Sequence, residues 1–362
     1  MTSSLNTPIS TRSARLMIGA ISFFLLLPLV ASRLPGVTRE RVFEGLDRRQ
    51  SITAIHRRLI FDEKGPVDVA IIGSSRIWTA LDAALVQTAL REHGHPSAVA
   101  LTLGMNHPAE DMIYVVLKDL LAQRKVRMLV IGQPARRQTS PHPELHRLFD
   151  PWLHFGVWRG LGWPDRARLY ALSVLGAPRI ALNALRKNLP PGPSADLREH
   201  RGAFIRALNF GHKLPFVQHH APPPEGAPSI LTSTGHRADL DVEAAEKFDF
   251  DPVSSPYQRY FMEEIMKLAA QHQIPVVMLA PPTLQEASRT KPHLLVSKEF
   301  VAEHRLSVVA VAPADLFSGV HDPGRVEDFY ADSTHLNQNG SRLFTQTMLP
   351  TLVKLYEQYA AK

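Results

Sequence analysis

The sequence predicts an α/β fold with a doubly wound parallel sheet of about five strands. Short apolar runs alternate with longer segments of helical periodicity, which is typical of strands joined by crossover helices. The runs are apolar throughout, as expected for strands that are covered on both faces. The predicted strands are 67–72, 98–103, 128–131, 275–280 and 307–312, and the predicted helices are 77–92, 109–124, 257–272 and 340–358.

A long interval separates the third and fourth predicted strands. It contains two segments with helical periodicity, near 165–187 and 196–208, and proline-rich stretches at 188–194 and 219–228. Proline fixes φ and removes a backbone donor, so these stretches are expected to be irregular. We therefore predict an α/β domain over residues 66–362 with a helical and proline-rich insertion at about 133–256.

An uncharged apolar segment lies near the N-terminus. Residues 16–32 follow Arg12 and Arg15 and carry no charge, which is typical of an export signal or a short membrane anchor. We interpret residues 1–33 as a signal-anchor or a signal peptide, favouring an uncleaved anchor, and residues 34–65 as a connecting helix. Either interpretation places the main domain outside the cytoplasm, in the periplasm; after cleavage the protein would be periplasmic or secreted.

Composition excludes several classes of site. The chain has 362 residues, 44% of them hydrophobic and 21% charged, which is an ordinary globular composition. It has no cysteine, so disulfides, thiolate metal sites and cysteine nucleophiles are excluded. The net charge is +7, but the basic residues are scattered and lack a nucleic-acid motif, so no nucleic-acid partner is expected.

A serine stands where the first predicted strand ends. Residues 71–76 read Ile-Ile-Gly-Ser-Ser-Arg. Gly73 permits a sharp turn, and a helix from Ile77 onward would direct its N-terminal dipole toward an anion beside Ser75. Ligands of open α/β sheets bind at the carboxyl ends of the strands, so Ser75 is a candidate nucleophile.

A carboxylate and an imidazole precede the last predicted helix. Residues 332–337 read Asp-Ser-Thr-His-Leu-Asn, and Asn337 is a plausible N-cap. A serine hydroxyl needs an imidazole that accepts its proton and a carboxylate that orients the imidazole. We therefore predict a triad of Ser75, His335 and Asp332.

The two blocks resemble those of the SGNH/GDSL hydrolase superfamily. In that family Gly-Asp-Ser follows the first strand and Asp-x-x-His precedes the final helix; here the blocks are Gly73-Ser74-Ser75 and Asp332-Ser333-Thr334-His335. The resemblance covers residues 66–132 and 257–358. It implies a three-layer sandwich and a serine nucleophile that works without metal or other cofactor.

One block of the family is missing. The family's third block is usually Gly-x-Asn-Asp, whose asparagine donates to the oxyanion hole, but this chain has Gly132-Gln133-Pro134-Ala135 at that place. The resemblance implies an oxyanion hole formed by the backbone of Ser75 and Gly104, with Asn106 or Gln133 as the third donor. Loss of such a donor lowers turnover by about 10²–10³.

The resemblance also implies a function. The Gly-Ser-Ser block and the apolar N-terminal segment are most similar to exported members linked to O-acetylation of polysaccharides or D-alanylation of teichoic acids. An acyl (acetyl) esterase or transferase acting on a polysaccharide is therefore expected, with an integral membrane acyltransferase as a partner that supplies acyl groups. The alternatives are a non-catalytic binding or assembly subunit of a polysaccharide-export or modification complex, and a periplasmic esterase for small esters.

Overall fold

The computed structural model describes residues 11–31, 33–44, 56–105, 109–134, 136–150, 152–185, 236–238, 248–320 and 323–360. The chain divides into two compact units. One unit, called the helical unit below, comprises Met1–Arg48 and Pro143–Pro190. The other, called the sheet unit, comprises Arg49–His142 and Pro191–Lys362.

The sheet unit contains the α/β fold that the sequence predicts. Its sheet has the order β2-β1-β3-β6-β8-β4, and the first five of these strands pair in parallel. Strand order reverses between β1 and β3, which is the position where doubly wound sheets bind ligands. The parallel strands are β1 (Val67–Ser74), β2 (Ala100–Met105), β3 (Val126–Gly132), β6 (Val276–Leu279) and β8 (Ser307–Ala310).

A sixth strand was not predicted. Strand β4 (His236–Ala238) lies inside the predicted insertion and pairs antiparallel with β8, with His236 opposite Ala310. A three-residue strand is too short for its periodicity to be recognised in the sequence.

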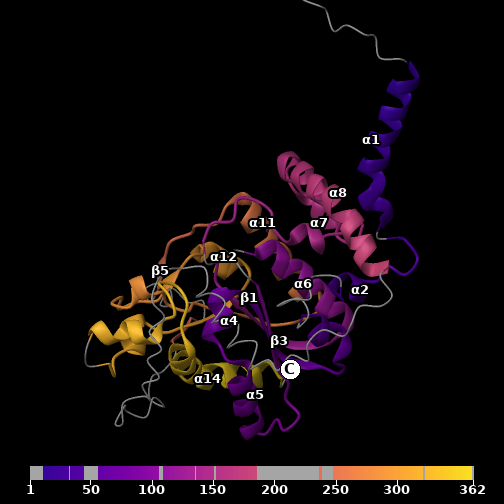
Figure 1. Ribbon diagram of the computed structural model, residues 1–362. Helices are drawn as coiled ribbons and strands as arrows, with labels where there is room; N and C mark the ends of the chain where they lie inside the picture. The colour runs from indigo at the N-terminus through magenta and orange to yellow at the C-terminus, as the bar shows by residue number, and fades with distance from the viewer. Residues whose placement is uncertain are drawn as a thin grey trace, which may run out of the picture. The chain divides into compact units, whose positions relative to one another are not determined.

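Helices cover both faces of the sheet. On one face, α5 (Ala83–Glu92) packs against α14 (Gln338–Ala360); on the other, α6 (Glu110–Gln123) packs against α11 (Pro256–Gln271), as Figure 1 shows. Successive strand residues point to opposite faces, so both faces of the buried β1 contribute apolar side chains.

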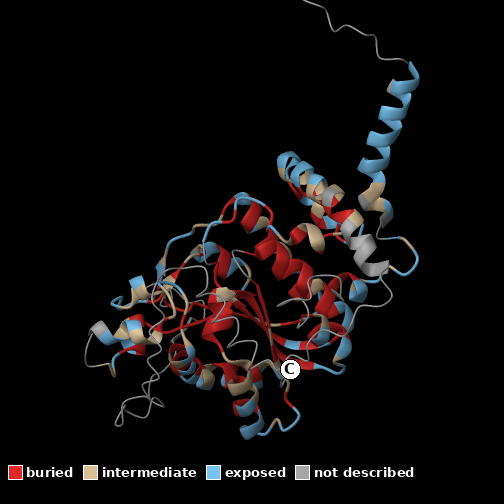
Figure 2. Cartoon of the chain, in the orientation of Figure 1, coloured by how far each residue is buried: buried red, intermediate tan, exposed pale blue. Residues whose placement is uncertain are grey.

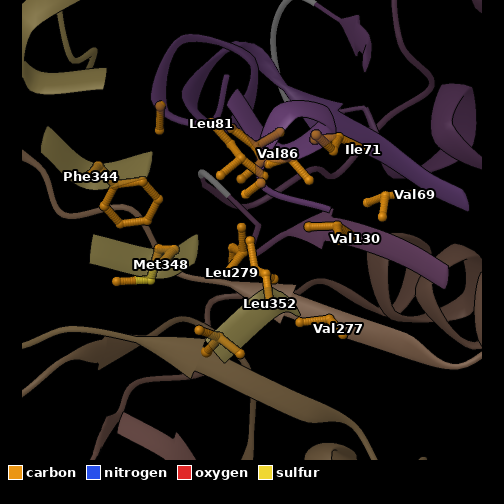
Figure 3. Close-up of a cluster of buried hydrophobic side chains, with 14 of the residues drawn as sticks. Val69, Ile71, Leu81, Val86, Val130, Val277, Leu279, Phe344, Met348 and Leu352 are labelled. Carbon is orange, nitrogen blue, oxygen red and sulfur yellow. The ribbon is translucent and has the colours of Figure 1, made fainter. Parts of the chain in front are cut away.

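The core beneath α5 and α14 is a continuous apolar cluster. It joins strand residues to side chains of the two helices, and Figure 3 shows Phe344 and Met348 of α14 facing the strands. Burial of this face fixes the register of the strands, since a one-residue shift would turn every apolar side chain to the wrong side. The labelled members are Val69, Ile71, Leu81, Val86, Val130, Val277, Leu279, Phe344, Met348 and Leu352.

The helix predicted over 77–92 is wrong in two respects. The chain forms α4 (Ser75–Ala80) and then α5, and the Asp82 side chain caps α5 by accepting from Ala84 N at 3.0 Å. Helix α4 also begins two residues earlier than predicted, so Ser75 is its first residue. By contrast, the N-cap predicted for the last helix is confirmed, since Asn337 Oδ1 accepts from Gly340 N at 3.0 Å.

The remaining elements of the sheet unit are short. Strands β5 and β7 form a separate parallel pair. These elements are η1 (Arg58–Asp62), β5 (Asp249–Phe250), η4 (Leu284–Glu286), β7 (His293–Leu294), α12 (Lys298–Glu303), α13 (Pro313–Leu316) and η5 (Pro323–Phe329).

The helical unit is held together by contacts between its first and last helices. Helix α1 (Thr11–Ala31) packs against α8 (Trp163–Leu185), and the Tyr170 hydroxyl donates to the carbonyl of Leu25. The helix predicted near 165–187 corresponds to α8, whereas the one predicted at 196–208 lies outside the described residues. The other elements are α2 (Arg39–Glu44), η2 (Leu145–Arg147) and α7 (Phe155–Gly160).

Only part of the predicted connecting helix over 34–65 is described. Its helical segments there are α2 and a turn that begins at His56 and continues into η1.

Within the part of the chain that the structure describes, no helix combines the length and apolar character needed to cross a membrane. This finding does not support the membrane segment predicted over residues 16–32.

Two buried carboxyl groups open α6. Asp111 accepts from the backbone of His142 at 2.7 Å and from the Tyr257 hydroxyl at 2.9 Å. Glu110 is also buried, and its Oε2 has no hydrogen-bond partner. Burial raises the pKa of Glu110 to about 7, although a hydrogen bond from Gln258 acts in the opposite direction.

The buried carboxyl group of Glu110 makes the stability of the fold depend on pH. The native state binds more protons than the unfolded chain between pH 4.5 and about 7, so stability from Glu110 is present at low pH and is lost as pH rises through this range. We expect Glu110→Gln to raise the free energy of unfolding at pH 8 by about 2–3 kcal/mol, and to change it little at pH 4. Urea unfolding at both pH values tests this; equal effects at both would contradict it.

Candidate active site

Ser75 stands at the carboxyl end of β1, beside the reversal of strand order. It is half-buried and opens α4, whose next five residues are all buried. The backbone N–H groups of a first helical turn have no acceptor within the helix, so they are available to an oxyanion beside the hydroxyl.

Three glycines allow α4 to lie close against the sheet. A Cβ on Gly73 would lie 2.5 Å from Cγ2 of Ile77, and one on Gly132 would lie 2.8 Å from Cβ of the same residue. A Cβ on Gly104 would lie 2.5 Å from Cγ of Trp78. Any side chain at these positions would displace α4, and with it Ser75.

The loop before α14 holds Asp332 and His335. The Asp332 Oδ1 accepts from the backbone of Thr334 at 2.8 Å and of His335 at 2.9 Å, and from the Thr334 hydroxyl at 3.0 Å. The other oxygen, Oδ2, lies 2.7 Å from His335 Nδ1. These bonds fix the carboxylate and the imidazole in one orientation.

The same contacts keep Asp332 ionised. Its partial burial alone would raise the pKa, but the hydrogen bonds from the His335 ring and from Thr334 outweigh burial and hold the pKa of Asp332 well below its usual range. A carboxylate that stays charged at neutral pH favours the Nδ1–H tautomer of His335 and stabilises an imidazolium.

The structure brings the two halves of the predicted triad together. His335 Nε2 lies 2.7 Å from Ser75 Oγ, across 260 residues of sequence. With Nδ1–H donated to Asp332, Nε2 is the acceptor and the Ser75 hydroxyl is the donor. This is the geometry that general-base activation of a serine requires.

Of the other predicted oxyanion donors, one is engaged elsewhere. The Gln133 side chain is buried; its Nε2 donates to the carbonyl of His293 at 3.1 Å, and its Oε1 accepts from Leu295 N at 3.0 Å. Gln133 therefore fixes the segment around β7. Gly104 lies in β2 opposite Gly73, and Asn106 lies outside the described residues.

A second buried network, which the sequence did not predict, adjoins the nucleophile. Arg76 donates to the carbonyl of Pro281 and lies 3.8 Å from Glu286 Oε2. Burial lowers the pKa of Arg76, while the Glu286 carboxylate counteracts this effect. His293 Nδ1 lies 2.7 Å from Glu286 Oε1.

This network connects the two halves of the site. Arg76 follows Ser75 directly, and Leu284 N, in the same short loop as Glu286, donates to the carbonyl of Ser333 at 3.1 Å. The loop after β6 is thus bonded both to the nucleophile turn and to the loop that carries His335. Glu286 also lies in a capping box with Thr283, a local signal visible as Thr-x-x-Glu in the sequence.

Among the described side chains, no group of three or more His, Asp or Glu residues is arranged to hold a metal ion. Comparison with known proteins adds no assignment: no family model, no curated protein and no solved structure matches the chain.

The buried ion pair yields a stability prediction. Glu286→Gln leaves the Arg76 guanidinium buried without its counter-charge, so the free energy of unfolding should fall by about 3 kcal/mol. The matched control is Glu263→Gln, which removes the exposed pair with Arg259 and should cost less than about 1 kcal/mol. Denaturant unfolding at pH 7 compares them; equal losses would show that the buried pair is not essential.

Proposed function

We propose that the chain is a serine-dependent acyl-transfer enzyme, an esterase or an O-acyltransferase, with Ser75 as nucleophile, His335 as general base and Asp332 as the orienting carboxylate. The observation that carries the proposal is the unbroken series of two 2.7 Å contacts from Ser75 Oγ through the imidazole to Asp332. Neither a metal nor another cofactor is needed for this chemistry.

The proposed reaction has two steps. Ser75 Oγ attacks the carbonyl carbon of an ester while His335 Nε2 takes the hydroxyl proton, and the imidazolium then protonates the departing alkoxide. In the second step His335 removes a proton from water or from an acceptor hydroxyl, which attacks the acyl-enzyme and releases Ser75. The acceptor decides between hydrolysis and transfer.

The substrate class rests on the two sequence blocks alone. Their resemblance to the SGNH/GDSL superfamily favours an acetyl or other acyl group on a cell-envelope or extracellular polysaccharide, with an integral membrane acyltransferase as donor partner. Export through residues 16–32, as an anchor or a cleaved signal, belongs to the same proposal. Export is supported by the exposure of nine large apolar side chains of α1 between Leu16 and Val30.

One observation favours a second function. The amide of Gln133, which stands where the family has an oxyanion asparagine, is bonded to backbone at β7. An incomplete oxyanion hole would suit a non-catalytic binding or assembly subunit of a polysaccharide-export or modification complex. A general esterase for small esters would use the same triad and differ only in acceptor.

Acyl-enzyme trapping tests the first function. The full chain in mild detergent is mixed with an activated acetyl ester, and intact mass and product release are measured. We expect an acetyl adduct on the wild type and none on Ser75→Ala, and a loss of turnover of about 10⁴ for Asp332→Asn, which leaves the imidazole in the wrong tautomer. Thr88→Ala, which removes an exposed hydroxyl on α5, is the control.

The outcomes of this experiment distinguish the candidate functions. Transfer of acetyl to added oligosaccharide would identify a transferase, and release to water alone an esterase. A folded wild type that gives neither adduct nor turnover would contradict the enzyme and favour the binding or assembly subunit.

A further inference from the structure

Exposed apolar side chains are concentrated in one of the two units. Among the described residues, all of the large exposed apolar side chains belong to the helical unit, and Figure 2 shows α1 mostly in pale blue. Nine are on α1; the other four lie between residues 152 and 163 and are called the aromatic edge below. The nine on α1 are Leu16, Met17, Ile18, Ile21, Phe23, Phe24, Leu25, Leu26 and Val30. The aromatic edge consists of Trp152, Leu153, Phe155 and Trp163.

The aromatic edge is held in place against α1. The indole N–H of Trp152 donates to the carbonyl of Leu29 at 2.7 Å, in the last turns of α1. Phe155 packs between Trp152 and Trp158, with ring centroids 6.5 and 6.0 Å away. Trp163 is 74% exposed at the start of α8. The rings of Trp152 and Phe155 are therefore fixed by neighbours although they face solvent.

Arginines lie beside two of the rings. The Arg33 guanidinium lies 5.8 Å from the centroid of Trp152, and that of Arg166 lies 5.6 Å from the centroid of Trp158. The described residues of this unit include ten arginines and five acidic residues, and no lysine. Indole rings with one polar edge, placed beside cations that pair with phosphate, suit the boundary between lipid tails and headgroups.

We propose that α1 and the aromatic edge bind the surface of an anionic phospholipid bilayer, with Trp152 and Trp163 at headgroup level. Basic side chains near an anionic surface add electrostatic attraction to apolar burial. A second copy of the chain is a less suitable occupant, because a symmetric contact would bring two arginine-rich surfaces together. The proposal does not depend on the acyl chemistry, and it takes α1 as an uncleaved helix that lies on the membrane surface.

Tryptophan fluorescence tests the surface directly, since three of the four tryptophans lie in residues 152–163. The full chain is bound to vesicles of phosphatidylglycerol and phosphatidylcholine with bromine on the acyl chains near the headgroup. We expect strong quenching of the wild type, and loss of much of it in Trp152→Ser and in Trp163→Ser. The control is Trp158→Phe, whose half-buried ring donates to Arg166 O and should contribute less.

The dependence of quenching on lipid charge is a second measurement. Quenching should be weaker in vesicles of phosphatidylcholine alone, and should decrease with added salt in the anionic vesicles. Equal quenching in both lipids would remove the anionic part of the proposal.

Two other outcomes would overturn the proposal that this surface binds a bilayer. Protein that sediments with vesicles while its emission stays insensitive to the brominated lipid would show that the aromatic edge is away from the bilayer. A concentration-dependent blue shift without lipid, with no quenching on vesicle addition, would identify a second copy as the occupant. Turnover of a soluble ester by Trp163→Ser reports separately on the proposed function, and we expect it to equal that of the wild type.

Discussion

The close packing of α4 on the sheet is the constraint on which the candidate site depends. Gly73, Gly104 and Gly132 come from three adjacent strands, and each leaves room for an α4 side chain where a Cβ would collide with it. Because Ile77 and Trp78 occupy that room, the first residue of α4 has one position relative to the strand ends. The Ser75 hydroxyl is thus positioned by backbone packing beneath it.

The partner of this hydroxyl, the His335 imidazole, depends more on hydrogen bonds. Leu336 anchors the loop of Asp332 and His335 in the apolar core, and hydrogen bonds hold the rest of it: the Asn337 cap at one end, the carboxylate of Asp332 inside it, and Leu284 N on Ser333 O from outside. Polar bonds of this kind each contribute about 1 kcal/mol, so the imidazole depends on several of them at once. Packing positions the nucleophile, whereas hydrogen bonds together with the burial of Leu336 position the base.

The sequence was a good guide where one physical rule dominated. Strands buried on both faces produce apolar runs, so all five parallel strands were predicted, and the need of a serine nucleophile for an imidazole and a carboxylate predicted that Ser75, His335 and Asp332 would meet. The break at Asp82 was missed, because two residues between helices leave the periodicity almost unchanged. The role of Gln133 could not be predicted, since its partners are backbone groups of His293 and Leu295, about 160 positions away. The pairing of Arg76 with Glu286 could not be predicted for the same reason. Arg76 nevertheless follows the Gly-Ser-Ser block, and Glu286 belongs to a Thr-x-x-Glu capping box.

The long separation between Ser75 and His335 has a consequence for synthesis of the chain. A ribosome makes the protein from the N-terminus, so Ser75 is complete when the imidazole 260 residues later has not yet been made. During that interval the hydroxyl has no base beside it and is as unreactive as any serine. The pairing therefore forms only after residue 335 has been made, and a nascent or truncated chain that lacks His335 would carry the nucleophile in an inert form.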